Sequence, residues 1–257
     1  MSMEMLLSVV GVTKRFGGLA ALEDVSLTVR TGEIYGLIGP NGAGKTTLFN
    51  CMTGLYTVTS GQVLLAGAPV HNRKPHEIVQ RGFARTFQNI RLFANMTALE
   101  NVMVGRHVRS RANVLGAVLR CARTRNEEKA IRDRSRELLD YVGLGNKGRY
   151  VASHLSYGDQ RRLEIARALA TEPKLLALDE PVAGMNPAER QQMGELFLKL
   201  RAGGVTLLLI EHDVKLVMGL CDRVAVLDYG RKIAEGDTAA VQKDPAVIAA
   251  YLGDEAP

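Results

Sequence analysis

Tryptophan is absent from the 257 residues, and cysteine occurs only three times, as Cys51, Cys121 and Cys221. No two of these form a CxxC pair, so we expect reduced thiols in the cytosol, buried as small hydrophobic side chains, rather than disulfides or a zinc site. Long apolar runs are also missing. The longest, such as 205–210, have the length of a strand and fall far short of the roughly 18 residues that cross a bilayer. Glu4 and a short apolar stretch at 5–10 argue against a secretory signal.

Acidic residues are scarce in one part of the chain. The stretch from Arg106 to Arg136 holds ten Lys/Arg against three Asp/Glu, while the whole chain has a formal net charge of +6. The rest of the chain is therefore close to neutral. This basic stretch predicts either a solvated helical face or a patch near anionic lipid head groups. No aromatic residues interleave its arginines, which argues against nucleic acid as the partner.

Strand-like and helix-like segments alternate along most of the chain. We expect strands at 7–10, 21–29, 34–38, 63–65, 175–178, 205–210 and, as the last, 224–227. Helices are expected to start after the glycine-rich turn at 39–44 and near Ser156, Pro187 and Asp213. This alternation predicts an α/β fold with a mostly parallel sheet covered on both faces. A helical pattern from about 92 to 155 interrupts the alternation and predicts an inserted subdomain.

A glycine-rich segment follows the strand at 34–38 and satisfies the P-loop pattern G-x-x-x-x-G-K-[ST]. Glycines let successive backbone N–H groups point at phosphate oxygens, and the start of the next helix adds its positive end. Lys45 would reach the β- and γ-phosphates, and the Thr46 hydroxyl would bind Mg²⁺. The predicted ATP-binding residues are Gly39, Pro40, Asn41, Gly42, Ala43, Gly44, Lys45, Thr46 and Thr47.

The strand at 175–178 is followed by two carboxylates, Asp179 and Glu180. A buried parallel strand delivers its last side chains to the carboxyl edge of the sheet, where ligands of α/β proteins bind. Asp179 is predicted to hold Mg²⁺ or its waters, and Glu180 to polarise the attacking water as the catalytic base.

Ser156 stands at the start of a helix, with Asp159 three residues later as in a capping box. The segment Leu155-Ser156-Tyr157-Gly158-Asp159-Gln160 resembles the signature motif of the ABC ATPases, which precedes the Asp-Glu strand in that family. The resemblance implies a P-loop (RecA-like) ABC ATPase core with an antiparallel β portion beside its mostly parallel sheet. One domain, 1–257, is expected, with its core at 1–91 and 156–257 and its helical subdomain at about 92–155.

The resemblance also assigns roles to single residues. Gln88 matches the Q-loop glutamine, which contacts Mg²⁺ and the permease-facing subdomain, and His212 matches the switch histidine that contacts the γ-phosphate. Phe16 stands where the family stacks an aromatic ring on adenine. Segment 183–186 matches the D-loop, with Asn186 in place of the more usual Asp. In the signature, Tyr157 and Asp159 replace the commoner Gly and a neutral residue.

The family mechanism implies that two ATPases pair head to tail. The signature residues then complete the ATP site of the opposite subunit, and they are Ser156, Tyr157, Gly158 and Gln160. ATP and Mg²⁺ are the implied ligands. Two transmembrane permeases, a second ABC ATPase (a paralogue or a copy of this chain) and an extracytoplasmic solute-binding protein are the implied partners. The resemblance places the chain peripherally at the cytoplasmic face of the membrane.

Segments 85–93 and 157–166 look like those of the branched-chain amino acid importers, whose longer, LivG-type ATPase carries an extra segment where 106–136 lies here. Urea or amides, aromatic acids or exported lipopolysaccharide remain alternative cargoes, because residues of this chain do not contact the cargo in such systems. A non-transport ABC ATPase of translation or DNA repair is more distant, since the chain has one cassette and neither zinc modules nor long coiled coils. A scaffold without hydrolysis is disfavoured by the presence of Glu180, Gln88 and His212.

Overall fold

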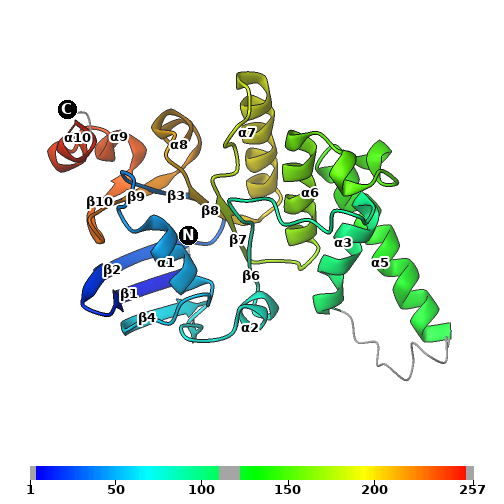
Figure 1. The fold of residues 1–257 in the computed structure, drawn as a ribbon, viewed down its shortest axis with the longest axis horizontal. Coiled ribbons are helices and arrows are strands. Elements are labelled where there is room, and N and C mark those ends of the chain that lie inside the picture. The colour runs from blue at the N-terminus through cyan, green and yellow to red at the C-terminus, as the bar shows by residue number, and fades with distance from the viewer. Residues whose placement is uncertain (1–3, 110–121, 253–257) are drawn as a thin grey trace.

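Two sheets organise the chain in a computed structural model, which describes residues 4–109 and 122–252. The first sheet is antiparallel and has the order β2-β1-β4-β5, with bounds β1 Met5–Phe16, β2 Leu19–Arg30, β4 Ser60–Leu65 and β5 Ala68–Pro69. The second has the order β10-β9-β3-β8-β7-β6, with bounds β3 Ile34–Ile38, β6 Phe83–Arg85, β7 Leu175–Asp179, β8 Thr206–Ile210, β9 Arg223–Asp228 and β10 Arg231–Asp237. Its strands run parallel except for β10, which pairs antiparallel with β9. The predicted combination of a mostly parallel sheet and an antiparallel portion is confirmed (Figure 1).

Side chains of the central strands alternate between two hydrophobic cores. In β8, Leu208 and Ile210 pack with helix α1 (Lys45–Met52) and the antiparallel sheet, whereas Leu207 and Leu209 face the other helices. β3, β7 and β9 divide their side chains in the same way. This burial on both faces explains why these strands are short, continuous apolar runs.

The remaining helices follow the order of the chain. They are α2 Pro75–Gln80, α3 Ala98–Arg106, η1 His107–Arg109, α5 Ala122–Tyr141, η2 Gly145–Lys147, η3 Ala152–His154, α6 Tyr157–Leu169, α7 Pro187–Ala202, α8 Val214–Leu220, α9 Thr238–Val241 and α10 Pro245–Leu252. Helices α3, α5 and α6 pack together at the side of the molecule away from the antiparallel sheet (Figure 1). The helices predicted after the glycine-rich turn and near Ser156, Pro187 and Asp213 are all present.

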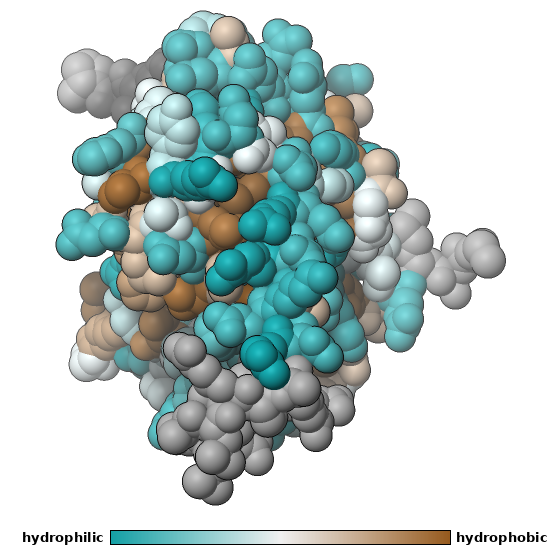
Figure 2. Space-filling model, turned by 90° about the vertical axis from the view of Figure 1, so that its right-hand side faces the viewer, coloured by the Kyte–Doolittle hydropathy of each residue, from teal (hydrophilic) through white to brown (hydrophobic). Residues whose placement is uncertain are grey.

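The basic stretch lies partly in α5, and its segment 110–121 lies outside the described residues. Ile131, Leu138 and Leu139 of α5 are buried, whereas Arg132, Arg134 and Arg136 are exposed. Figure 2 shows this side of the molecule as largely hydrophilic, with smaller hydrophobic areas between. The described part of the stretch is therefore a helix with an exposed basic face, which both a solvated face and a patch near lipid head groups require.

The strand expected to be the last, at 224–227, is followed by another, so that expectation was wrong. β10 was missed because its residues are only partly buried and four of the seven are charged. Its Glu235 accepts hydrogen bonds from Arg223 Nη2 over 2.8 Å and from the Tyr35 hydroxyl over 2.7 Å. These hydrogen bonds to side chains of β9 and β3 help to hold β10 at the edge of the sheet, although β10 lacks the apolar pattern of a buried strand.

Cys51 and Cys221 are buried free thiols, as expected, and burial raises the pKa of Cys51 to about 11. Cys121 lies outside the described residues. Within residues 4–109 and 122–252, no helix combines the length and apolar character that a bilayer crossing needs.

Candidate functional site

The predicted phosphate-binding loop connects β3 to α1. Gly39 has a φ of 150°, and a Cβ atom there would collide with the carbonyl oxygen of Leu227 in β9. Gly44, which precedes the first helical residue, has a φ of 99°. Side chains at either position would be strained, so the glycines of the motif are required by the close approach of the loop to the sheet.

Lys45 is the first residue of α1, and its side chain folds back into the loop. Nζ donates to the carbonyl oxygens of Gly39 over 2.6 Å and of Pro40 over 2.8 Å. Burial lowers the pKa of Lys45, and Glu180 opposes that shift. The ammonium group is thus held at the centre of the loop, with the exposed hydroxyl of Thr46 on the same first helical turn.

Asp179 ends β7 and is 4% exposed. Burial raises its pKa, and the guanidinium of Arg85, whose Nη2 lies 3.5 Å from Oδ2, opposes this effect. Arg85 belongs to β6 and stacks on the Phe49 ring with Cζ 3.9 Å from the ring centroid. Burial lowers the pKa of Arg85 to about 10, well above neutral pH, so the buried carboxylate has a permanent cationic neighbour. Arg85 was not among the predicted site residues, although an arginine at the end of a buried strand is unusual and needs a partner.

Glu180 lies between Gln88 and His212, the two residues that were predicted to act with it. The Gln88 amide donates from Nε2 to Glu180 Oε2 over 3.0 Å, and His212 Nδ1 lies 3.7 Å from Oε1. Glu180 itself has a φ of 45°, a conformation that a non-glycine residue adopts at some energetic cost. Three loops at the carboxyl edge of the sheet, following β6, β7 and β8, therefore converge on one carboxylate.

Glu211 is a second carboxylate at this edge, and it is fully buried. Its Oε1 accepts from the backbone N–H of Val182 over 3.4 Å, whereas Oε2 is buried without a hydrogen-bond partner and lies 3.9 Å from His212 Nδ1. Burial raises the pKa of Glu211, and the N–H of Val182 and the His212 side chain oppose it. Glu211 was not among the predicted site residues, although its place between a buried strand and the predicted histidine was a usable signal.

The signature residues lie at the start of α6. Ser156 caps this helix, because its hydroxyl accepts from the backbone N–H of Asp159 over 3.3 Å. In a capping box the Asp159 carboxylate would also accept from the backbone N–H of Ser156. Here Asp159 Oδ2 accepts from the Ser156 hydroxyl instead. Gln160 donates to the carbonyl oxygen of Leu155, and the Tyr157 ring is exposed.

A small cavity adjoins Ser156 and Gly158, and its other described lining residues come from α6, α7 and Met185 before α7. No residue of the phosphate loop lines it. The chain therefore brings Glu180, Gln88 and His212 together but does not place its signature serine against its own phosphate loop. Asn186 caps α7, since its Oδ1 accepts from the backbone N–H of Glu189 over 3.0 Å.

Phe16 is 45% exposed, as an adenine-stacking ring would have to be. Its ring meets Tyr56 edge to face, with centroids 5.3 Å apart, and Lys14 Nζ lies 4.8 Å from its centroid. Neither contact was predicted, although Lys14 lies two residues before Phe16 in β1; Tyr56 comes from a distant part of the chain.

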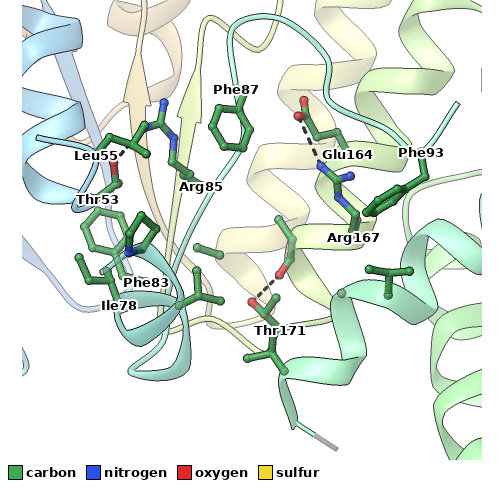
Figure 3. Close-up of a pocket in the computed structure, with 17 residues that line it drawn as sticks. Thr53, Leu55, Ile78, Phe83, Arg85, Phe87, Phe93, Glu164, Arg167 and Thr171 are labelled. Atoms are coloured by element: carbon green, nitrogen blue, oxygen red, sulfur yellow. Dashed lines mark hydrogen bonds and ion pairs between the residues drawn. The ribbon is translucent and has the colours of Figure 1, made fainter. Parts of the chain in front are cut away.

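A larger cavity of about 350 Å³ lies between α2 and β6 on one side and α3 and α6 on the other. Figure 3 shows Ile78 and Phe83 on one side, Phe93 and Arg167 on the other, and Phe87 between them. The lining is mostly apolar, and Phe93 is 48% exposed. Phe87 immediately precedes Gln88, so this groove adjoins the loop that contacts Glu180.

The chain is similar in sequence to known proteins. The family model for "ABC transporter" matches residues 22–183, and a model for "Branched-chain amino acid ATP-binding cassette transporter" matches residues 231–257. The high-affinity branched-chain amino acid transport ATP-binding protein LivG of Escherichia coli (strain K12) is 45% identical over 97% of this chain and 98% of its own.

Solved structures show the same likeness. The ADP conformation of MJ1267, an ATP-binding cassette of an ABC transporter, has a TM-score of 0.85 and 33% identity over 97% of this chain and 99% of its own. A dimeric cassette, MJ0796 bound to ADP and Pi, has a TM-score of 0.76 and 26% identity over 91% of this chain and 99% of its own.

Proposed function

Since this chain belongs to the ABC transporter family of ATP-binding proteins, we propose that it hydrolyses ATP to drive an importer of branched-chain amino acids. The observation that carries the proposal is Glu180, held between Gln88 and His212 at the sheet edge that also carries the phosphate loop. The family model that matches 231–257 and the printed function of LivG favour this cargo over amides, aromatic acids or lipopolysaccharide.

Each side chain has a specific part in the proposed hydrolysis. Lys45 exchanges the carbonyl oxygens of Gly39 and Pro40 for phosphate oxygens, because both offer acceptors to the same ammonium group. Glu180 takes a proton from the attacking water, while Gln88 and His212 fix the direction of its two oxygens. The Phe16 ring, backed by Tyr56, offers its exposed surface to the adenine.

The residues fit a bound Mg²⁺. Thr46, Gln88 and Asp179 offer hydroxyl, amide and carboxylate oxygens, the hard donors that this ion prefers. The described residues hold no cluster of His, Cys, Asp and Glu that would complete a metal cage. This suits Mg²⁺, which binds through few protein ligands together with phosphates and waters. When bound, the ion would neutralise charge that develops on the phosphate oxygens.

A second ATPase completes the site in this proposal. The signature residues Ser156, Tyr157, Gly158 and Gln160 would contact ATP bound to the opposite subunit, which accounts for their separation from the phosphate loop of their own chain. The dimeric MJ0796 cassette supports a pairing of this kind. The partner is expected to be a paralogue of this chain.

The groove in Figure 3 is the proposed docking site for a cytoplasmic helix of the permease. Its apolar lining suits an amphipathic helix, and the Arg167 guanidinium, whose side chain is 18% exposed, can pair with a polar residue of that helix. Arg85 lines the groove and contacts Asp179, so a helix in the groove would touch residues that adjoin the ATP site. The chain would then lie on the cytoplasmic face of the membrane, next to two permeases that receive solute from an extracytoplasmic binding protein.

The test is an affinity pull-down of tagged E180Q protein from solubilised native membranes with ATP, followed by mass spectrometry. We expect recovery of two different permeases and a shorter ATPase. F93E in the groove should abolish recovery of the permeases, whereas L198E, an equally exposed position in α7, should not. Recovery of ribosomes or DNA, or of no membrane protein, would overturn the transport proposal while leaving the ATPase activity intact.

A further inference from the structure

Asp159 accepts the only hydrogen that the Ser156 hydroxyl can donate. Ser156 Oγ lies 2.8 Å from Asp159 Oδ2, and the same oxygen atom of Ser156 accepts from the Asp159 backbone N–H. Burial alone would raise the pKa of Asp159, but hydrogen bonds from Lys147 and Ser156 outweigh it and lower the pKa. The carboxyl group is thus ionised and can only accept.

Lys147 is the second partner of this carboxylate. Its Nζ lies 2.6 Å from the same Oδ2 atom, and the two side chains are 35% and 16% exposed. Lys147 comes from η2, well before the signature segment, so that the ion pair exists only in the folded chain. Arg162 is a further cation near Asp159, but its Nη2 donates to Gln192 Oε1 over 2.6 Å.

We propose that Lys147 and Asp159 form a latch on the signature serine. In the empty site the Ser156 hydroxyl donates its hydrogen bond to Asp159. When the hydroxyl donates instead to the γ-phosphate of ATP bound to the opposite subunit, Lys147 still neutralises the Asp159 carboxylate. The proposal rests on the function in trans proposed above for Ser156. Lys147 and Asp159 are positioning residues, because they act on the nucleotide only through Ser156.

The electrostatic reason is the charge of the incoming phosphate. A carboxylate one hydrogen bond away from Ser156 would repel a phosphate that binds to the same hydroxyl, and this repulsion is strongest where water is excluded. Lys147 cancels the charge of Asp159 at short range. Without Lys147, the subunit interface would have to close over ATP with two like charges side by side.

The experiment uses the intact transporter, purified through this subunit, and measures KM for ATP and kcat of hydrolysis. K147Q is expected to raise KM about tenfold with a much smaller change in kcat, since repulsion weakens the closing of the interface over ATP. K147R keeps the charge and should stay within about threefold of the parent, as should the double variant K147Q/D159N, which removes both charges. R162Q, the matched control, should have a smaller effect than K147Q.

An unchanged KM in K147Q would overturn the latch. So would a K147Q effect that persists in the D159N background, or an equal effect of R162Q, because either would show that the Lys147–Asp159 pair is not what matters. ADP affinity of the isolated chain, which depends on its own phosphate loop, should be the same in all variants and reports on folding. Failure of the unsubstituted complex to hydrolyse ATP would instead overturn the proposed function.

Discussion

Arg161 donates from Nη1 to the carbonyl oxygen of Phe87 over 2.7 Å, which connects the helix of the signature serine to the loop of Gln88. The same guanidinium donates to the carbonyl oxygen of Gln88 and to the Tyr157 hydroxyl. Arg161 is 3% exposed, and Glu164 pairs with its charge at 3.4 Å. One buried cation therefore joins the helix that follows Ser156, the loop of Gln88 and the wall of the groove in Figure 3, to which Phe87 and Glu164 both belong.

We expect R161A to lower the free energy of unfolding by about 3–5 kcal/mol, because it leaves Glu164 buried without this partner and two carbonyl oxygens without a donor. R162A, one residue further along α6, removes an exposed hydrogen bond to Gln192 and should cost about 0.5 kcal/mol or less. Urea denaturation measures the free energy of unfolding of both variants. Equal losses in the two variants would contradict the bridging role of Arg161.

E180Q should keep ATP binding but slow hydrolysis by about 10²–10⁴-fold, because an amide cannot accept the proton of the attacking water. E195Q, at an exposed position in α7, is the matched control and should hydrolyse ATP at the parent rate. Steady-state phosphate release and nucleotide titration provide the two measurements. Near-normal turnover in E180Q would remove Glu180 as the base.

K45A should weaken nucleotide affinity about tenfold or more, since it removes the charged donor from the centre of the phosphate loop. K243A, at an exposed lysine, should bind nucleotide as the parent does. Fluorescence titration with a labelled nucleotide distinguishes the two. An unaltered affinity in K45A would count against the assignment of the loop.

E211Q should change how stability depends on pH. Burial raises the pKa of Glu211, so its protonated form is favoured in the folded state. Such a group contributes stability below its ordinary pKa of 4.5, and this contribution is lost as the pH rises through the higher folded value. The free energy of unfolding of the parent should therefore fall relative to that of E211Q as the pH rises above 4.5. Denaturation at several pH values measures the difference, and a constant gap would refute the prediction.

Gly105 and Gly194 lie within helices but have opposite surroundings. A Cβ atom at Gly105 in α3 would collide with the carbonyl oxygen of Arg167 in α6, whereas one at Gly194 in α7 would meet nothing within 4 Å. G105A should destabilise the protein by about 1–3 kcal/mol through overpacking, and G194A should stabilise it by about 0.5–1 kcal/mol through helix propensity. Thermal unfolding of both variants and of the parent measures these changes in stability. A stabilised G105A variant would show that α3 can move away from α6 at little cost.

Much of the fold was accessible from local patterns. The apolar runs at β3, β7 and β8 predicted buried parallel strands, because strands covered on both faces carry few polar residues. β10 escaped prediction because its position depends on contacts of Glu235 with Arg223 and Tyr35, which its own residues do not reveal. β1 runs from Met5 to Phe16, longer than the apolar segment at 7–10, because its polar half also pairs with β2.

The sequence by itself determined the phosphate loop, the two carboxylates at the end of β7 and the serine that caps α6, because each depends on neighbouring residues with a fixed local geometry. Only the tertiary structure decided which distant side chains meet: Gln88 and His212 at Glu180, Arg85 at Asp179, Lys147 at Asp159, and Arg161 at the loop of Gln88. These pairs join segments 12 to 94 residues apart. No local propensity encodes them, since they form only when packing of the two cores brings the loop ends together.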